Sequence, residues 1–169
     1  MSDLIFWSRT GRRIELDYHR MIQALQGKGI YRYFLEGNEY AEKPIFVQVN
    51  ENKVKQVDDG YMLNLLNEVI DDHGDATVRE LFMSARNKLS FERLSLLPSL
   101  KQEFLTDDRD RSYFFFRKSV GIVYDDKIEI VPYSKVDGLI WESQIINHDL
   151  EASLQRYQNT QSAPKKTSV

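Results

Sequence analysis

Apolar and polar positions follow two different periods along the chain. From residue 12 to residue 29, apolar side chains recur every three or four positions, and Gly27 and Gly29 end the run. This spacing predicts an amphipathic helix. The next residues, 30–37, alternate well enough to predict a strand, and residues 44–59 predict a β-hairpin that turns at residues 50–52.

The middle of the chain keeps the helical period. Residues 60–74 predict a helix with Asp58 or Asp59 as its N-cap, because a short carboxylate can accept from free amides of the first turn. A second helix is predicted from Asp75 or Thr77 onward. A short third helix is predicted to start at Ser90 and to be broken near Pro98.

After residue 112 the period changes to two. Three short strands are predicted at 113–116, 121–124 and 127–133, and the last two are joined by Asp125–Asp126. Residues 139–146 predict either another strand or a docking segment. The order of elements predicts an α+β fold with an N-terminal helix, strand and hairpin, a helical middle, and C-terminal antiparallel strands.

The length of 169 residues fits one α+β accessory domain over residues 1–150. The polar residues 151–169 predict a disordered tail. The apolar stretch near the N-terminus covers only Leu4–Trp7, so neither a signal peptide nor a membrane span is expected. The sequence has no cysteine, which excludes disulfides and thiol nucleophiles and fits a reducing cytoplasm.

The net charge of −3 hides a segregation of charge. Residues 8–32 carry six Lys/Arg against two acids, and residues 84–118 carry eight against five. Residues 39–75 carry nine acids against three lysines. Two basic segments on one face could follow a phosphate backbone, whereas a solvated surface with local ion pairs is the simpler alternative.

Catalytic motifs are absent from the sequence. The one Gly-Lys, Gly27–Lys28, lacks the other residues of a phosphate-binding loop, and no Gly-x-Ser-x-Gly occurs. The three histidines are scattered without ligand spacing and are expected at the surface. Paired aspartates, such as Asp107–Asp108, lie at predicted turns and helix ends, where they favour capping over a catalytic metal. No cofactor and no enzymatic activity of this chain alone are expected.

The segment "SYFFFRKSVGIV" allows two interpretations. In a strand, Phe114 and Phe116 face one side while Tyr113 and Phe115 face the other. Exposed rings beside cations can stack on bases, but aromatic runs next to aliphatic strands favour burial on both faces. We therefore expect core packing here, and Arg117 and Lys118 are the better candidates for nucleic-acid contact.

A longer stretch, "DDRDRSYFFFRKSVGIVYDDKIEIVPYSKVDGLIWESQIINHDL", resembles the region before the helicase motor in superfamily 3 primase-helicases of bacteriophages and mobile elements, notably those of Bacteroidetes. The matching residues are aromatic, aliphatic and polar: Tyr113 to Phe116, Ile128, Ile130, Tyr133, Gly138, Ile140, Trp141, Glu142, Gln144, Ile145, Ile146 and Asp149. A weaker similarity extends toward residue 3. Position 119 is Ser, where the family often has Asn.

The resemblance implies a DNA-replication accessory domain whose ATPase motor is absent from this chain: either the chain is a separately encoded or truncated version, or the motor is on another chain. It implies DNA, single-stranded or forked, and a primase or helicase motor as partners, with no membrane. Arg12, Arg13, Arg117 and Lys118 are the predicted DNA-binding residues. A protein-interaction module without DNA contact, and a metal-dependent nuclease using an aspartate cluster, are the alternatives.

Overall fold

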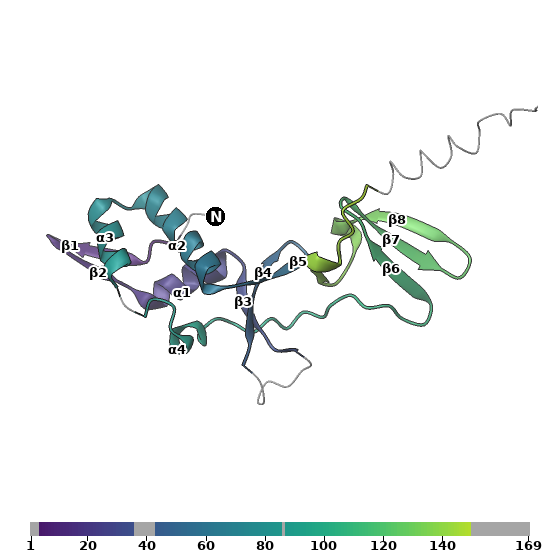
Figure 1. Cartoon of the computed structure of the whole chain (residues 1–169), viewed down its shortest axis with the longest axis horizontal. Helices are drawn as coiled ribbons and strands as arrows, with labels where there is room; N and C mark the ends of the chain where they lie inside the picture. The colour runs from purple at the N-terminus through teal and green to yellow at the C-terminus, as the bar shows by residue number, and fades with distance from the viewer. Residues whose placement is uncertain (1–3, 36–42, 86, 150–169) are drawn as a thin grey trace, which may run out of the picture. The chain divides into compact units, whose positions relative to one another are not determined.

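The computed structural model describes residues 4–35, 43–85 and 87–149 (Figure 1). The contacts divide the chain into two compact units, and each is described by itself. The first consists of Met1–Asn50 and Val54–Lys101, and the second of Glu51–Lys53 and Gln102–Val169. The predicted tail over 151–169 lies outside the described residues.

The first unit begins with a hairpin that the sequence pattern did not predict. Strand β1 (Trp7–Thr10) pairs antiparallel with β2 (Arg13–Leu16). Its two-residue loop starts with Gly11, whose φ of 62° is the left-handed value that a glycine adopts at low cost. The predicted helix over 12–29 was therefore wrong in its first third, because Ile14 and Leu16 satisfy an alternating pattern equally well and find a partner strand.

Helix α1 (Tyr18–Gly27) follows directly. Its N-cap is Asp17, whose side chain accepts from the amides of His19 and Arg20 at 3.0 Å. One face is buried through Met21, Ile22, Ala24 and Leu25, as the periodicity predicted.

A sheet follows in which β3 (Ile30–Tyr33) pairs antiparallel with β4 (Ile45–Asn50), and β4 is next to β5 (Lys53–Val57). The predicted hairpin is confirmed. The predicted strand over 30–37 is confirmed for residues 30–33, and residues 36 and 37 of that prediction lie outside the described residues. Gly29 permits the entry into this sheet: its φ is 82°, and a Cβ there would lie 2.3 Å from the carbonyl oxygen of Val49.

The three helices of the middle region are confirmed, together with their caps. Helix α2 (Asp59–His73) is capped by Asp58, α3 (Ala76–Ser84) by Asp75, and α4 (Phe91–Leu94) by Ser90. The apolar faces of α2, α3 and α4 pack with the apolar face of α1 in one continuous core. The largest side chains of this core that are almost fully buried are Phe6, Phe82, Met21, Leu25, Ile30, Met62, Leu66, Ile70, Leu94 and Leu97.

The second unit is built on a three-stranded antiparallel meander. Strands β6 (Arg111–Phe115), β7 (Ser119–Tyr124) and β8 (Ile128–Pro132) lie in that order, so β7 is central. The short β9 (Ile140–Trp141) lies beside the tip of the β4–β5 hairpin, where the amide of Ile140 donates to the carbonyl of Asn52 at 2.8 Å. The core of this unit is small: Phe115, Val120, Tyr133 and Ile140.

These elements make an α+β fold with three small sheets, as the sequence predicted. The single domain over 1–150 stays a prediction, since two compact units can still unfold as one cooperative domain. Across the part of the chain that the structure describes, no helix has the length and apolar character needed to cross a membrane.

Candidate nucleic-acid interface

The four cations predicted to bind DNA lie at the tips of two hairpins. Arg12 is the second loop residue between β1 and β2, and Arg13 is the first residue of β2. Both side chains are exposed. Arg13 forms an ion pair with Glu15 across 2.7 Å, but the two side chains are so exposed that this pair contributes little stability.

The second tip is the turn between β6 and β7, where Arg117 and Lys118 follow Phe116. Both side chains are exposed. Lys118 places its Nζ 3.0 Å from Asp149 Oδ2, in a pair that solvent screens. Among the described residues, no ion pair involves Arg117.

The backbone beneath this tip is held in place by the chain that follows β9. The amide of Arg117 donates to the carbonyl of His148 at 3.1 Å, and the amide of Ile146 donates to the carbonyl of Phe115 at 2.8 Å. The hydroxyl of Tyr133 donates to the carbonyl of Phe116. The tip therefore presents two cations on a fixed loop, which lowers the entropy lost when an anion binds.

The two pairs of cations belong to different compact units, so each tip is considered by itself. Sequence reasoning located all four residues in exposed positions. It did not identify the shared feature, which is that each pair occupies a tight turn between antiparallel strands.

The aromatic triplet is divided between two environments. Phe115 is in the core, and the ring of Tyr113 lies parallel to it with centroids 6.5 Å apart. Phe114 points to the other face and is 47% exposed. The prediction of burial on both faces was wrong for Phe114, because the second unit has one small core and it covers one face of the sheet.

The open face of the meander is apolar. The strand register places Phe114, Gly121 and Ile130 side by side on this face, and Ile128 lies one pair further along β8. Ile130 is 39% exposed and Ile128 is 68% exposed. Sequence reasoning missed these side chains, because alternation shows only that they share a face of the sheet and not that this face is open.

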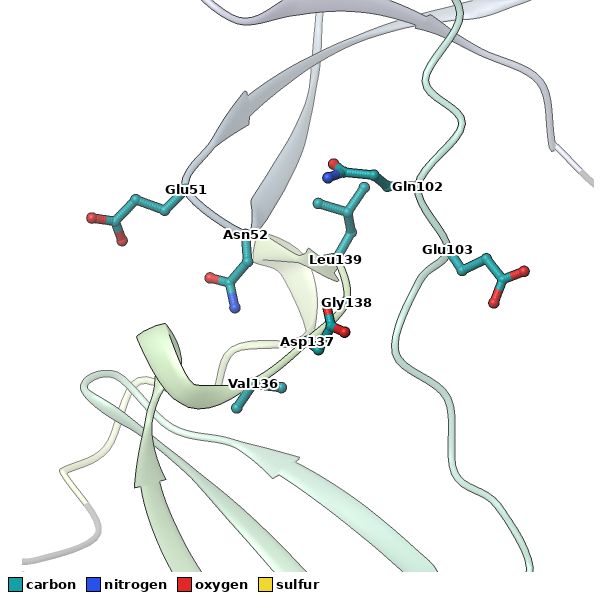
Figure 2. Close-up of a pocket in the computed structure, with 8 residues that line it drawn as sticks. All are labelled: Glu51, Asn52, Gln102, Glu103, Val136, Asp137, Gly138 and Leu139. Atoms are coloured by element: carbon teal, nitrogen blue, oxygen red, sulfur yellow. The ribbon is translucent and has the colours of Figure 1, made fainter.

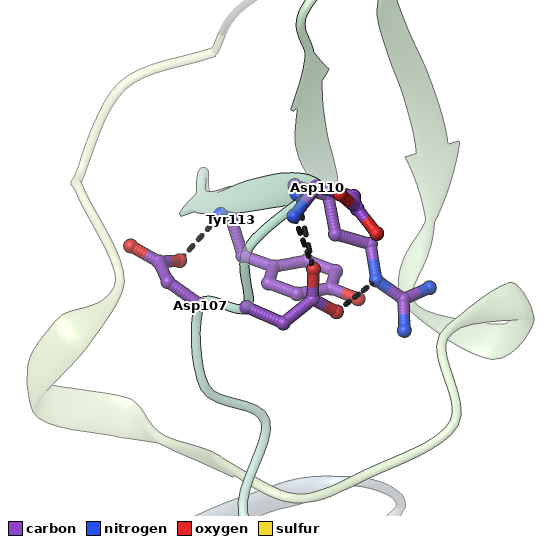
Figure 3. A network of polar contacts seen from close by, with 5 residues as sticks. Asp107, Asp110 and Tyr113 are labelled. Atoms are coloured by element: carbon purple, nitrogen blue, oxygen red, sulfur yellow. Dashed lines mark hydrogen bonds and ion pairs between the residues drawn. The ribbon is translucent and has the colours of Figure 1, made fainter.

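Aspartates organise the opposite end of β6 (Figure 3). Asp108 accepts from the amides of Asp110 and Arg111 at 3.0 Å and from Arg111 Nε at 2.6 Å. Asp107 accepts from the amide of Tyr113 at 2.8 Å. Capping of turns was the expected role of these aspartates, and the hydrogen bonds confirm it.

Hydrogen bonds and burial shift the pKa values of several groups. The hydrogen bond from the Arg111 guanidinium, together with the amide of Asp110, lowers the pKa of Asp108 below its usual value. At the N-cap of α3, the amide of Val78 and the side chain of Arg9 lower the pKa of Asp75 in the same way. Burial raises the pKa of Tyr133. These carboxylates are ionised at neutral pH and already have hydrogen-bond donors.

A pocket of about 420 Å³ lies elsewhere in the second unit (Figure 2). Its lining includes Glu51, Glu103 and Asp137, and in Figure 2 the Glu51 and Glu103 side chains extend in opposite directions. Asn52 donates through Nδ2 to the carbonyl of Tyr133 at 3.1 Å. The acidic lining disfavours phosphate, so this pocket does not extend the cationic tip.

Within residues 4–35, 43–85 and 87–149, no group of three or more His, Cys, Asp or Glu is placed to hold a metal ion. His19, His73 and His148 are all exposed, as expected from the sequence.

Comparison of the chain with known protein families, with characterised proteins and with solved structures found no match.

Proposed function

We propose that this chain is an accessory domain of DNA replication that binds single-stranded or forked DNA through the Arg117–Lys118 tip and the neighbouring Phe114. The single observation that carries the proposal is the position of two exposed cations on a fixed turn, in the same hairpin as an exposed aromatic ring. The resemblance of residues 112–149 to the region before the motor of phage-type primase-helicases supports the choice of DNA as ligand. A primase or helicase motor would then act in trans, in the cytoplasm.

The geometry suggests how such binding would work. Arg117 and Lys118 would contact phosphates and displace counterions, so the observed affinity should fall with salt. Phe114 lies three residues before the tip, about 10 Å along the strand at the usual rise per residue. An unpaired base can stack on an exposed aromatic ring whatever its identity. Binding would therefore depend on strand accessibility and little on sequence.

The Arg12–Arg13 tip would provide a second phosphate contact. It lacks a large exposed aromatic side chain among its strand neighbours, because Trp7 packs edge-on against Phe6. We expect this tip to add electrostatic affinity without a preference for single strands.

Fluorescence anisotropy with labelled single-stranded, forked and duplex DNA at low salt tests the proposal. We expect Arg117→Ala/Lys118→Ala to weaken binding about tenfold or more, and to reduce the salt dependence, because two phosphate contacts are lost. The control Arg20→Ala/Arg79→Ala removes the same charge from exposed helix positions, where each arginine is in an ion pair with a nearby aspartate.

Phe114→Leu separates stacking from charge. The variant keeps an apolar side chain on the open face but removes the ring, so we expect weaker binding to single strands and unchanged binding to duplex. The DNA proposal fails if the wild type does not bind at micromolar protein, or if the control double variant weakens binding as much as the tip double variant.

A protein-docking role is the second candidate, and the exposed aliphatic side chains Ile128 and Ile130 favour it. Such side chains contribute to protein interfaces but not to phosphate binding. A pull-down that recovers a primase or helicase subunit, from a chain that shows no DNA binding, would favour this role.

A further inference from the structure

The two edges of the β6–β7–β8 sheet differ in how their outward backbone groups are satisfied. Along β6, the carbonyl of Arg111 accepts from the amide of Asp108 at 3.0 Å. The amide of Tyr113 donates to Asp107, and the carbonyl of Phe115 accepts from Ile146. Side-chain and loop contacts therefore cover the β6 edge, which is a common protection against pairing with another strand.

The β8 edge lacks this protection. The amide of Tyr124 donates to the carbonyl of Lys127 at 2.8 Å, so Lys127, Glu129 and Val131 direct their backbone groups toward β7. Ile128 and Ile130 then direct theirs outward. No backbone hydrogen bond to these outward groups is found among the described residues. Their side chains are also exposed, and β8 is the last strand of its sheet.

We infer that the β8 edge pairs antiparallel with β8 of a second copy of this chain, about a two-fold axis at Ile128. Such a strand addition satisfies the outward amide and carbonyl of Ile128 and joins two three-stranded sheets into one. The two-fold axis is perpendicular to the sheet, so the open apolar faces of the two copies become continuous.

Charge complementarity selects this register. With Ile128 opposite Ile128 of the second copy, Lys127 lies opposite Glu129 of the second copy, and the same contact occurs twice by symmetry. Within one chain, Lys127 Nζ already lies 2.6 Å from Glu129 Oε1, so the pairing brings four alternating charges together. Oppositely charged residues directly across an antiparallel pair are stabilising.

Neighbouring registers are less favourable. Centring the pair on Glu129 places two carboxylates directly opposite each other, which is destabilising. Centring it on Ile130 places Ile128 opposite Pro132 of the second copy, and proline has no amide hydrogen for the ladder. The register centred on Ile128 leaves Pro132 outside the paired residues.

An edge pair of this length buries less area than a permanent dimer needs, so we expect a weak, concentration-dependent dimer. The inference does not depend on DNA binding, since Arg117 and Lys118 lie at the opposite end of the strands.

Sedimentation velocity of the full chain over a range of concentrations, with charge-reversed variants, tests the inference. Lys127→Glu alone or Glu129→Lys alone places like charges opposite each other at both symmetric positions. We expect each to weaken self-association about tenfold or more. The double variant Lys127→Glu/Glu129→Lys restores both the charge pattern and the net charge, and it should dimerise like the wild type.

A mixture of the two single variants supplies an independent check. Each cross-strand position in the mixed pair again places a carboxylate opposite an ammonium group, so a heterodimer should form where neither variant dimerises alone. Trp141 fluorescence of each variant confirms that the second unit remains folded.

Amide hydrogen exchange reports the edge directly. The Ile128 amide should become protected as the concentration rises, whereas the amide of Val131, which points toward β7, should be protected at every concentration. A wild-type chain that stays monomeric at the highest soluble concentration would overturn the inference. Single charge-reversal variants that dimerise as well as the wild type would also overturn it. The β8 edge would then be open to a peptide strand of another protein.

Discussion

The two compact units of this chain bury their apolar residues in different ways. In the first unit, the apolar faces of four helices meet the β1–β2 hairpin and β3 in one extended core that includes Phe6, Met21 and Phe82. In the second unit, one face of a three-stranded sheet packs on a few side chains, and the other face exposes Phe114, Ile128 and Ile130.

We therefore expect the first unit to contribute most of the stability and the second unit to contribute most of the binding surface. The first unit has the apolar burial to be stable through packing. The second unit depends more on hydrogen bonds that fix the ends of its strands, such as those that Asp107 and Asp108 accept and the one that Tyr133 donates. A sheet with one open face and one open edge leaves apolar side chains and backbone groups uncovered, and such surfaces are typical of sites that bind partners.

The largest expected effect is the contrast between two phenylalanine truncations. Phe82→Ala in the first unit removes a ring that is 1% exposed, and it should lower the free energy of unfolding by about 3–5 kcal/mol. Phe114→Ala in the second unit should cost less than about 1 kcal/mol, because its ring is already half in solvent.

Urea unfolding can follow each unit separately, since the two tryptophans, Trp7 and Trp141, lie one in each unit. Trp141→Phe leaves a reporter of the first unit, and Trp7→Phe leaves a reporter of the second. Equal costs for Phe82→Ala and Phe114→Ala would contradict the comparison. Coincident shifts of both reporters on Phe82→Ala would indicate that the units unfold as one domain.

A smaller effect is expected from the aspartate that fixes the start of β6. The folded-state pKa of Asp108 is lowered, so its contribution to stability is present above its usual pKa of 3.8 and is lost as the pH falls through the lower folded value. Asp108→Asn should therefore be less stable than the wild type at neutral pH, and the difference should shrink at pH values below 3.8.

The Trp141 reporter measures this difference by urea unfolding at several pH values. Asp125→Asn is the matched control, since it makes the same charge change in the exposed loop between β7 and β8. A stability difference that is independent of pH would argue against the carboxylate at Asp108 as its source.

The smallest effect is expected at Ser119, which is 7% exposed and whose Oγ has no hydrogen-bond partner among the described residues. Ser119→Ala removes a buried polar group without a partner, so stability should be unchanged or should rise by up to about 1 kcal/mol. Thermal unfolding checks this, with the exposed Ser134→Ala as control. A clear loss of stability in Ser119→Ala would mean that the hydroxyl is hydrogen-bonded in solution.

Local sequence determined most elements of this protein. Helices α2, α3 and α4 begin directly after their N-caps Asp58, Asp75 and Ser90, because capping depends on a side chain and the next three amides. The strands of the second unit follow from alternation and from the Asp125–Asp126 turn. The exposure of Arg12, Arg13, Arg117 and Lys118 follows from their charge, since uncompensated burial of a charge is costly.

Other features depend on contacts between residues that are far apart in the chain, and only the tertiary structure shows these contacts. Residues 13–16 suit a helix or a strand, and pairing with β1 selects the strand. The sequence of β6 does not reveal which face is covered, because Phe114 and Phe115 are chemically identical and only the position of the small core distinguishes them. The open β8 edge likewise depends on the order of strands in the sheet. The amides on that side of β8 point outward because no strand of the sheet lies beyond β8.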